Sequence, residues 1–191
     1  MAKADSAAAK RERLKTIKWV VTIFFVTIMI SGIISLVSDE VMANSSVAVA
    51  FIILLAIIFL GIVFDIVGMA VATADEKPFH SMASRKVPGA QEAIRLLRNA
   101  ERVSSICNDV VGDICGVVSG SASATIAALI LSNAEFGWPR GVSLVMSALV
   151  AGLTVGGKAI GKSIAVNSCT KIVHLVGRVI HAMNRFTKKK K

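Results

Sequence analysis

The apolar residues of the chain are gathered into long runs instead of being spaced along one face of short segments. Three strong runs cover residues 19–37, 47–74 and 142–166, and a run of about 18 or more apolar residues is typical of a transmembrane helix. A fourth run, residues 103–131, contains acidic residues, Gly and Ser but is still long enough to cross a bilayer. The pattern predicts an all-α polytopic membrane protein with four transmembrane helices.

Two amphipathic segments lie beside the predicted spans. Residues 90–102 place Ala, Ile and Leu near one face and Arg mainly elsewhere, and residues 172–186 form a basic amphipathic helix. Helices of this kind lie along a membrane surface. We therefore divide the chain into a basic N-terminal tail (1–18), a transmembrane domain (19–170) and a basic C-terminal helix and tail (171–191).

Basic residues are unevenly distributed among the segments outside the spans. The formal net charge is +10, and six Lys and Arg fall in residues 1–18, six in 75–103 and seven in 171–191. The connections 38–46 and 132–141 hold a single Arg between them. Because basic residues collect on the cytoplasmic side, we expect both termini in the cytoplasm and a multi-pass location in the cell (inner) membrane. The basic clusters are expected to meet anionic lipids, and not nucleic acid.

Ionisable residues occur inside the predicted spans, where a charge at the bilayer centre costs about 2.5–3.5 kcal/mol or more. Asp109 and Asp113 are one helical turn apart, as are Lys158 and Lys162, while Asp65 stands alone. We expect all of them to point into the helix bundle. They are either internal ion pairs that orient the helices or an ion or proton site in the membrane.

Oxygen-bearing side chains favour a hard cation, because Mg²⁺ binds carboxylate, amide and carbonyl oxygens. The candidate metal ligands are Asp65, Asn108, Asp109 and Asp113. Lys158 and Lys162 are the candidate charge-balancing or gating residues. No nucleophile paired with a base, phosphate-binding loop or dinucleotide fingerprint is evident, so we do not expect an enzyme.

Glycines follow the spacing of close helix contacts. Small residues four positions apart let two helix backbones approach each other in a membrane. The candidate helix-packing residues are Gly112, Gly116, Gly157 and Gly161.

Three segments, taken in order, resemble the transmembrane domain of the CNNM/CorC magnesium-transport family. They are residues 64–70, 89–109 and 157–163, and the resemblance covers about residues 47–170. It implies that Asp65 takes the place of a cation-binding Ser, that Asn108 and Asp109 take the place of Asn ligands, and that the protein is a homodimer. The family's regulatory CBS modules are not found in this chain, so a separate regulatory protein is a possible partner.

This chain departs from the family pattern within its motifs. Lys158 stands where the family has Glu, Gly161 where it has Pro, and Gly68 where it has Glu. The leading hypothesis is a membrane transporter or exchanger of a divalent cation, with Mg²⁺ expected. Two alternatives stay open. One is a non-transporting interaction or regulatory module with internal Lys–Asp ion pairs, and the other is a carrier of an anionic or lipid-phosphate substrate.

Overall fold

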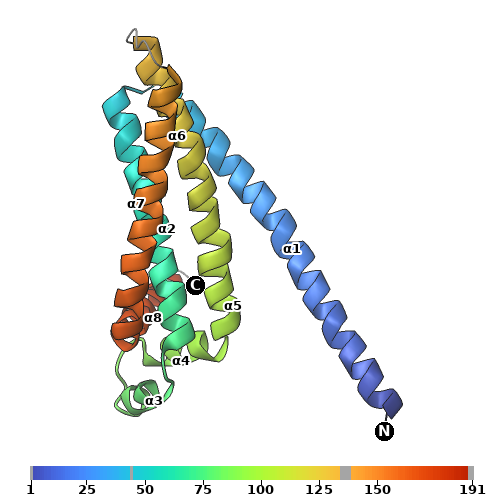
Figure 1. The fold of residues 1–191 in the computed structure, drawn as a ribbon. Coiled ribbons are helices and arrows are strands. Elements are labelled where there is room, and N and C mark those ends of the chain that lie inside the picture. The colour runs from blue at the N-terminus through green and yellow to red at the C-terminus, as the bar shows by residue number, and fades with distance from the viewer. Residues whose placement is uncertain (1, 44, 134–138, 189–191) are drawn as a thin grey trace.

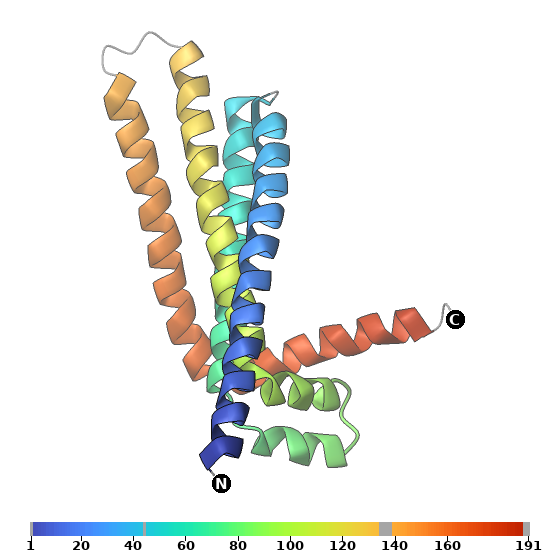
Figure 2. The ribbon, with the colours of Figure 1, turned by 90° about the vertical axis from the view of Figure 1, so that its right-hand side faces the viewer.

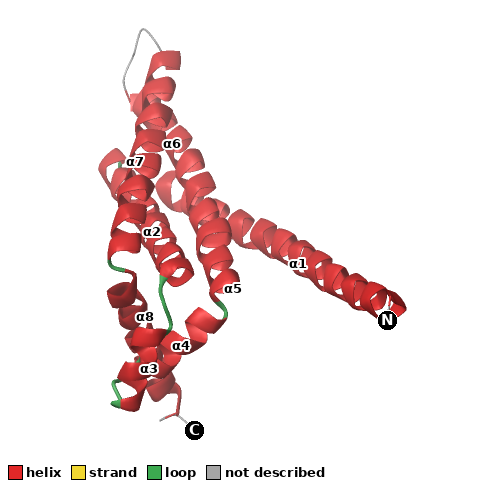
Figure 3. Ribbon diagram, turned by 60° about the horizontal axis from the view of Figure 1, so that its bottom comes forward, coloured by secondary structure: helices red, strands yellow, loops and turns green. Residues whose placement is uncertain are grey.

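The computed structural model describes residues 2–43, 45–133 and 139–188, and it contains no strand within those ranges (Figure 3). The elements in chain order are α1 (Ala2–Ala43), α2 (Val47–Thr73), α3 (Lys77–Ser84), α4 (Ala90–Arg98), α5 (Ala100–Ser105), the π-helix η1 (Ile106–Gly112), α6 (Asp113–Asn133), α7 (Pro139–Asn167) and α8 (Cys169–Lys188). The predicted all-α class is confirmed.

Four helical segments are long and apolar enough to cross a membrane. They are Thr16–Met42, Val47–Thr73, Ala100–Ser132 and Arg140–Asn167. Each overlaps one of the runs seen in the sequence, so the prediction of a multi-pass membrane protein is confirmed. Successive spans run in opposite directions along the molecule (Figures 1 and 2).

The first span stands partly apart from the others. Its N-terminal part leaves the bundle, while its C-terminal part lies against α6 (Figure 1). Ser38 and Met42, near its end, are buried, but most of its large apolar side chains are exposed. The helix begins at Ala2, so the basic segment before Trp19 continues the span without a break.

The helices α2, α6 and α7 form the bundle, whose apolar core has two main parts. One lies at the end where α1 meets α2 and is formed by Met42, Ala50, Leu54, Ile58, Ala122, Ile126, Ala127, Met146 and Val150. The other lies at the opposite end and is formed by Ala70, Val71, Phe79, Ala93, Ala165 and Val173. Along α2, Asp65 falls between the two clusters and is itself buried.

Three helices at the second end, α3, α4 and α8, form what we call the platform. The helix α8 leaves the bundle across the direction of the spans (Figure 2). It crosses α4 where Gly89 and Gly177 meet, because a Cβ on Gly177 would lie 2.4 Å from the Gly89 carbonyl oxygen. Gly89 also has φ of 87°, a left-handed conformation that glycine adopts readily.

The platform differs from its sequence-based description in two places. The connection after α2 contains α3, which was not predicted and whose Phe79 is fully buried. The amphipathic segment 90–102 is divided at Asn99, whose backbone leaves the helical region, so that α5 belongs to the third span.

Candidate functional site

The ammonium group of Lys158 lies where α7, α2 and the end of η1 meet. Its Nζ is 3.9 Å from Asp65 Oδ1 and 3.9 Å from Asp113 Oδ1. It also donates a hydrogen bond of 3.4 Å to the carbonyl oxygen of Gly112. The carboxylate distances exceed the roughly 2.7–2.9 Å of a charge-assisted hydrogen bond, so the ammonium is shared between two acids without being bonded to either.

The three charged side chains differ in how far they are covered. The side chain of Asp65 is 8% exposed and that of Lys158 is 22% exposed, whereas that of Asp113 is 71% exposed. Asp65 is therefore a buried acid whose nearest counter-charge is Lys158. The pair links α2 to α7, and Asp113 joins it from the open side of α6.

The π-helix η1 provides the space for the ammonium. A π-helix closes its hydrogen bonds from residue i to i+5 and is often found at functional sites. Here it ends at Gly112, where a Cβ would lie 3.4 Å from Lys158 Nζ and 3.6 Å from Asp65 Oδ1. A Cβ at position 112 would thus be in van der Waals contact with both charged side chains.

Two side-chain oxygen atoms on α2 and η1 are buried and have no hydrogen-bond partner within the described part of the chain. They are Asp65 Oδ2 and Asn108 Oδ1. The amide nitrogen of Asn108 donates a hydrogen bond of 3.3 Å to Ser104 Oγ. The amide oxygen of Asn108 lies only 2.1 Å from the place where a Cβ on Gly68 would be. An unsatisfied buried acceptor costs about 1–3 kcal/mol. Carboxylate and amide oxygens without donors are also the atoms that a hard cation binds.

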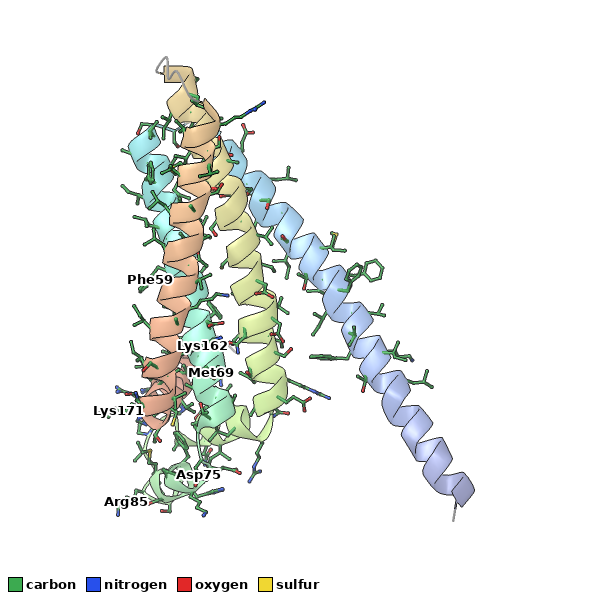
Figure 4. The ribbon with its side chains drawn as sticks, in the orientation of Figure 1. Phe59, Met69, Asp75, Arg85, Lys162 and Lys171 are labelled. Atoms are coloured by element: carbon green, nitrogen blue, oxygen red, sulfur yellow. The ribbon has the colours of Figure 1, made fainter. Side chains whose placement is uncertain are left out.

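The other predicted charges do not enter the bundle. Asp109 is exposed and accepts a hydrogen bond of 2.7 Å from Ser105 Oγ. Lys162 is exposed, forms no ion pair with any described residue, and lies in the half of the bundle nearer the platform (Figure 4). Its long side chain can carry the ammonium towards the membrane surface. The expectation that all five charges point inward is therefore not met, because Asp109, Asp113 and Lys162 lie on exposed faces of η1, α6 and α7.

Of the glycines predicted to pack between helices, some contact a neighbouring helix and one does not. Gly157 and Gly161 pack against α2, since a Cβ at each would lie 2.3 Å and 2.8 Å from side-chain carbons of Ile62 and Ile66. The prediction that Gly116 packs against a neighbouring helix is not met, because no heavy atom of the described residues lies within 4 Å of the place where its Cβ would be. The four-residue spacing continues through Gly120, where again no described atom lies within 4 Å of the place where a Cβ would be.

The predicted ligands do not converge as one set. Across residues 2–43, 45–133 and 139–188, no three His, Cys, Asp or Glu side chains gather in a way that could hold a metal ion. Lys158 Nζ lies at the same 3.9 Å from both Asp65 and Asp113. A cation that used both acids would have to displace this ammonium.

An apolar groove of about 580 Å³ runs between α2 and α7 on another side of the bundle. Exposed Phe59 projects beside it (Figure 4). The lining residues are Leu55, Ile58, Phe59, Ile62, Gly152, Leu153, Gly156, Gly157 and Ile160. Neither Lys158 nor Lys162 lines the groove, so it offers no support for a carrier that binds a lipid phosphate with these lysines.

The platform contains polar contacts that the sequence did not reveal. His181 Nδ1 of α8 lies 2.9 Å from Glu92 Oε1 of α4, and Arg98 Nε donates to Glu76 Oε1 at 3.0 Å. Burial raises the pKa of Glu92, but the hydrogen bond with His181, a backbone hydrogen bond and nearby positive charge together bring that pKa below its ordinary value. The amphipathic spacing of the sequence predicted helices at α4 and α8, but it gave no indication that these two helices contact each other.

A scan against models of protein families, a search of curated proteins and a search of solved structures each find no match to this chain. The resemblance to the CNNM/CorC family therefore stays a prediction.

Proposed function

We propose that this membrane protein transports or exchanges a cation, with Mg²⁺ as the expected ion, through the layer formed by Asp65, Gly112 and Lys158. The observation that carries the proposal is a buried oxygen without a donor, Asp65 Oδ2, on the acid that faces a loosely held ammonium. A second buried oxygen without a donor, Asn108 Oδ1, belongs to η1, the element that ends at Gly112. Buried ionisable residues in a membrane span are expensive, and they commonly mark ion pathways.

In this proposal Lys158 is an internal counter-ion. Without a bound cation its ammonium balances Asp65, which would otherwise be a buried, unpaired charge. A cation that enters from the exposed side at Asp113 takes the oxygens of Asp65, Asn108 and the Gly112 carbonyl, and Lys158 moves towards Asp113. The equal distances of Lys158 from the two acids support such an exchange of partners.

Reconstitution into liposomes tests this function. We expect uptake of Mg²⁺, followed with an enclosed fluorescent indicator, to fall at least tenfold in Asp65→Asn. The matched control is Asp75→Asn, an exposed acid beyond the end of α2 that should leave uptake unchanged (Figure 4). Wild-type uptake in Asp65→Asn, or no uptake of any of Mg²⁺, Ca²⁺ and Na⁺ by the unaltered protein, would overturn the proposal.

A second candidate is the non-transporting module with internal ion pairs. It is favoured by the same position of Lys158, which already provides a counter-charge for both acids. A double-mutant cycle between Lys158→Met and Asp65→Asn separates the two candidates. Strong coupling of stability in a protein that shows no cation uptake would support the module, whereas cation uptake that depends on Asp65 would exclude it.

We further propose that both termini and the platform are cytoplasmic and that the working form is a homodimer. The basic residues of the platform support the orientation. Asp109 and Asp113 support the dimer, because exposed acids within a span do not face lipid. A symmetric contact would bring the same exposed surface of the third span from both copies together. A monomer mass in lipid nanodiscs would contradict the dimer.

A further inference from the structure

The helix α8 has an exposed apolar stripe that no part of the described chain covers. Val173 and Gly177 are buried, and α8 packs on α4 through this side. Spacings of three and four residues put a second set of side chains on one other face. This stripe consists of Leu175, Val179, Met183 and Phe186, whose exposed fractions are 59%, 53%, 64% and 76%.

The stripe lies on the membrane side of the platform. In Figure 2, α8 extends sideways from the bundle and α4 lies on the side of α8 that is away from the spans. Because α4 covers that side, the exposed stripe turns towards the level of the spans. It continues the exposed apolar surface at the end of α7, where Ile164 is 51% and Val166 is 50% exposed.

A row of basic residues runs beside the stripe. Lys171, Arg178 and Arg185 are seven residues apart, which places them along one side of α8, and all three are exposed. None of them forms an ion pair with another residue in the described ranges. An uncompensated basic row parallel to an apolar stripe is the pattern of a helix that lies in a membrane interface.

We propose that α8 is embedded lengthwise in the leaflet on the platform side, and that its basic row binds anionic phospholipid headgroups. The stripe enters the acyl boundary while Lys171, Arg178 and Arg185 lie at the level of the phosphates. The helix α4 supports α8 from the water side through the Gly89–Gly177 crossing and the contact of Glu92 with His181. This inference does not depend on the proposed transport function.

A fluorescent probe on the stripe tests the embedding in the whole protein. Cys107 and Cys115 are buried, so only Cys169 is replaced by serine before Met183→Cys is labelled. In nanodiscs we expect doxyl-labelled lipid to quench this probe and aqueous iodide to leave it bright. The matched control is a probe on Ser84→Cys, at the exposed end of α3, which should respond in the opposite way.

Quenching by doxyl-phosphatidylglycerol compared with doxyl-phosphatidylcholine tests the headgroup. We expect the preference for phosphatidylglycerol to fall about fivefold for each of Arg178→Gln and Arg185→Gln, the factor that corresponds to about 1 kcal/mol per basic residue near an anionic surface. Arg85→Gln, which removes a platform charge away from α8, should not change it (Figure 4).

Two results would overturn the proposal. Iodide quenching at Met183 as strong as at Ser84 would show that the stripe faces water or a soluble partner. Equal quenching by the two doxyl lipids in the protein with all its basic residues would show that the row does not select anionic headgroups.

Discussion

The two halves of the helix bundle are held together in different ways. In the half away from the platform, α2, α6 and α7 meet through aliphatic side chains such as Leu54, Ile126 and Val150. In the half nearer the platform a second apolar cluster, which includes Ala70 and Ala165, is accompanied by glycine contacts and by a lysine between two acids. Because lipid tails are as apolar as Leu, aliphatic contacts alone give little preference for one helix orientation over another in a membrane.

The charged layer, formed by Asp65, Asp113 and Lys158, therefore specifies the orientation of the helices. Rotating α2 or α7 about its axis would turn Asp65 or Lys158 towards lipid, at a cost of about 2.5–3.5 kcal/mol or more for each charge. The half without charges tolerates such rotations far better. The difference suggests that the half with the charged residues determines how the whole bundle is arranged.

The largest expected effect comes from removing the buried counter-charge. Lys158→Met leaves Asp65 buried without a partner, and breaking a buried pair costs about 3–5 kcal/mol; we expect the lower end because Lys158 is 22% exposed. Unfolding with SDS in mixed micelles measures the loss. Lys162→Met, which removes an exposed lysine one turn away, should change the free energy of unfolding by less than about 0.5 kcal/mol. Equal losses in both variants would contradict the distinction between the two lysines.

A smaller effect is expected where Gly61 of α2 packs against Cys115 of α6. In Gly61→Ala the new Cβ would lie 2.8 Å from Cys115 Cβ, an atom near the backbone that cannot easily move. Overpacking of this kind costs about 1–3 kcal/mol. The neighbouring Gly116→Ala meets open space and should be neutral or stabilising. The same SDS titration compares the two, and a destabilising Gly116→Ala would indicate that a second copy covers α6 there.

The smallest effect is expected at the platform. The pKa of Glu92 is lowered in the folded protein, so the contact with His181 stabilises the fold above the ordinary Glu value of 4.5 and is lost as the pH falls through the lower folded pKa. The pair is near the surface, so we expect less than about 1 kcal/mol. Hydrogen exchange of α8 amides between pH 5 and pH 3, after correction for the intrinsic rate, measures this loss of stability. Glu92→Gln should abolish the pH dependence of the α8 exchange rates that remains after this correction.

Much of the fold could be predicted because it follows from the length and position of the apolar runs. The apolar runs located all four spans, and their ends differ from the helices by a few residues. The platform was harder, since α3 is short and carries only Phe79 as a fully buried anchor. The π-helix could not be predicted, because residues 106–112 contain nothing that separates an i+5 pattern from an i+4 pattern.

The candidate site was predictable only in part for the same reason. Spacing placed Asp113 and Asp109 on one face, but it could not show which neighbour that face meets. The structure brings Asp65, Asp113 and Lys158 together and leaves Asp109 and Lys162 exposed. Which of two lysines one turn apart reaches an acid depends on the rotation of α7 against α2. Gly157 and Gly161 pack on Ile62 and Ile66 in the rotation that brings Lys158 to the acids.

The π-helix also determines the angular phase of everything that follows it in the third span. Each residue of an α-helix advances the chain by about 100° around its axis, and a π-helix, whose hydrogen bonds close from residue i to i+5, advances it by less. The wider winding of η1 is the phase in which Asp113 faces Lys158 and in which Ile114 and Val118 are buried. If residues 106–112 closed i→i+4 bonds at the same chain length, α6 would turn about its axis, and Asp113 would leave Lys158 with every side chain still in the sequence.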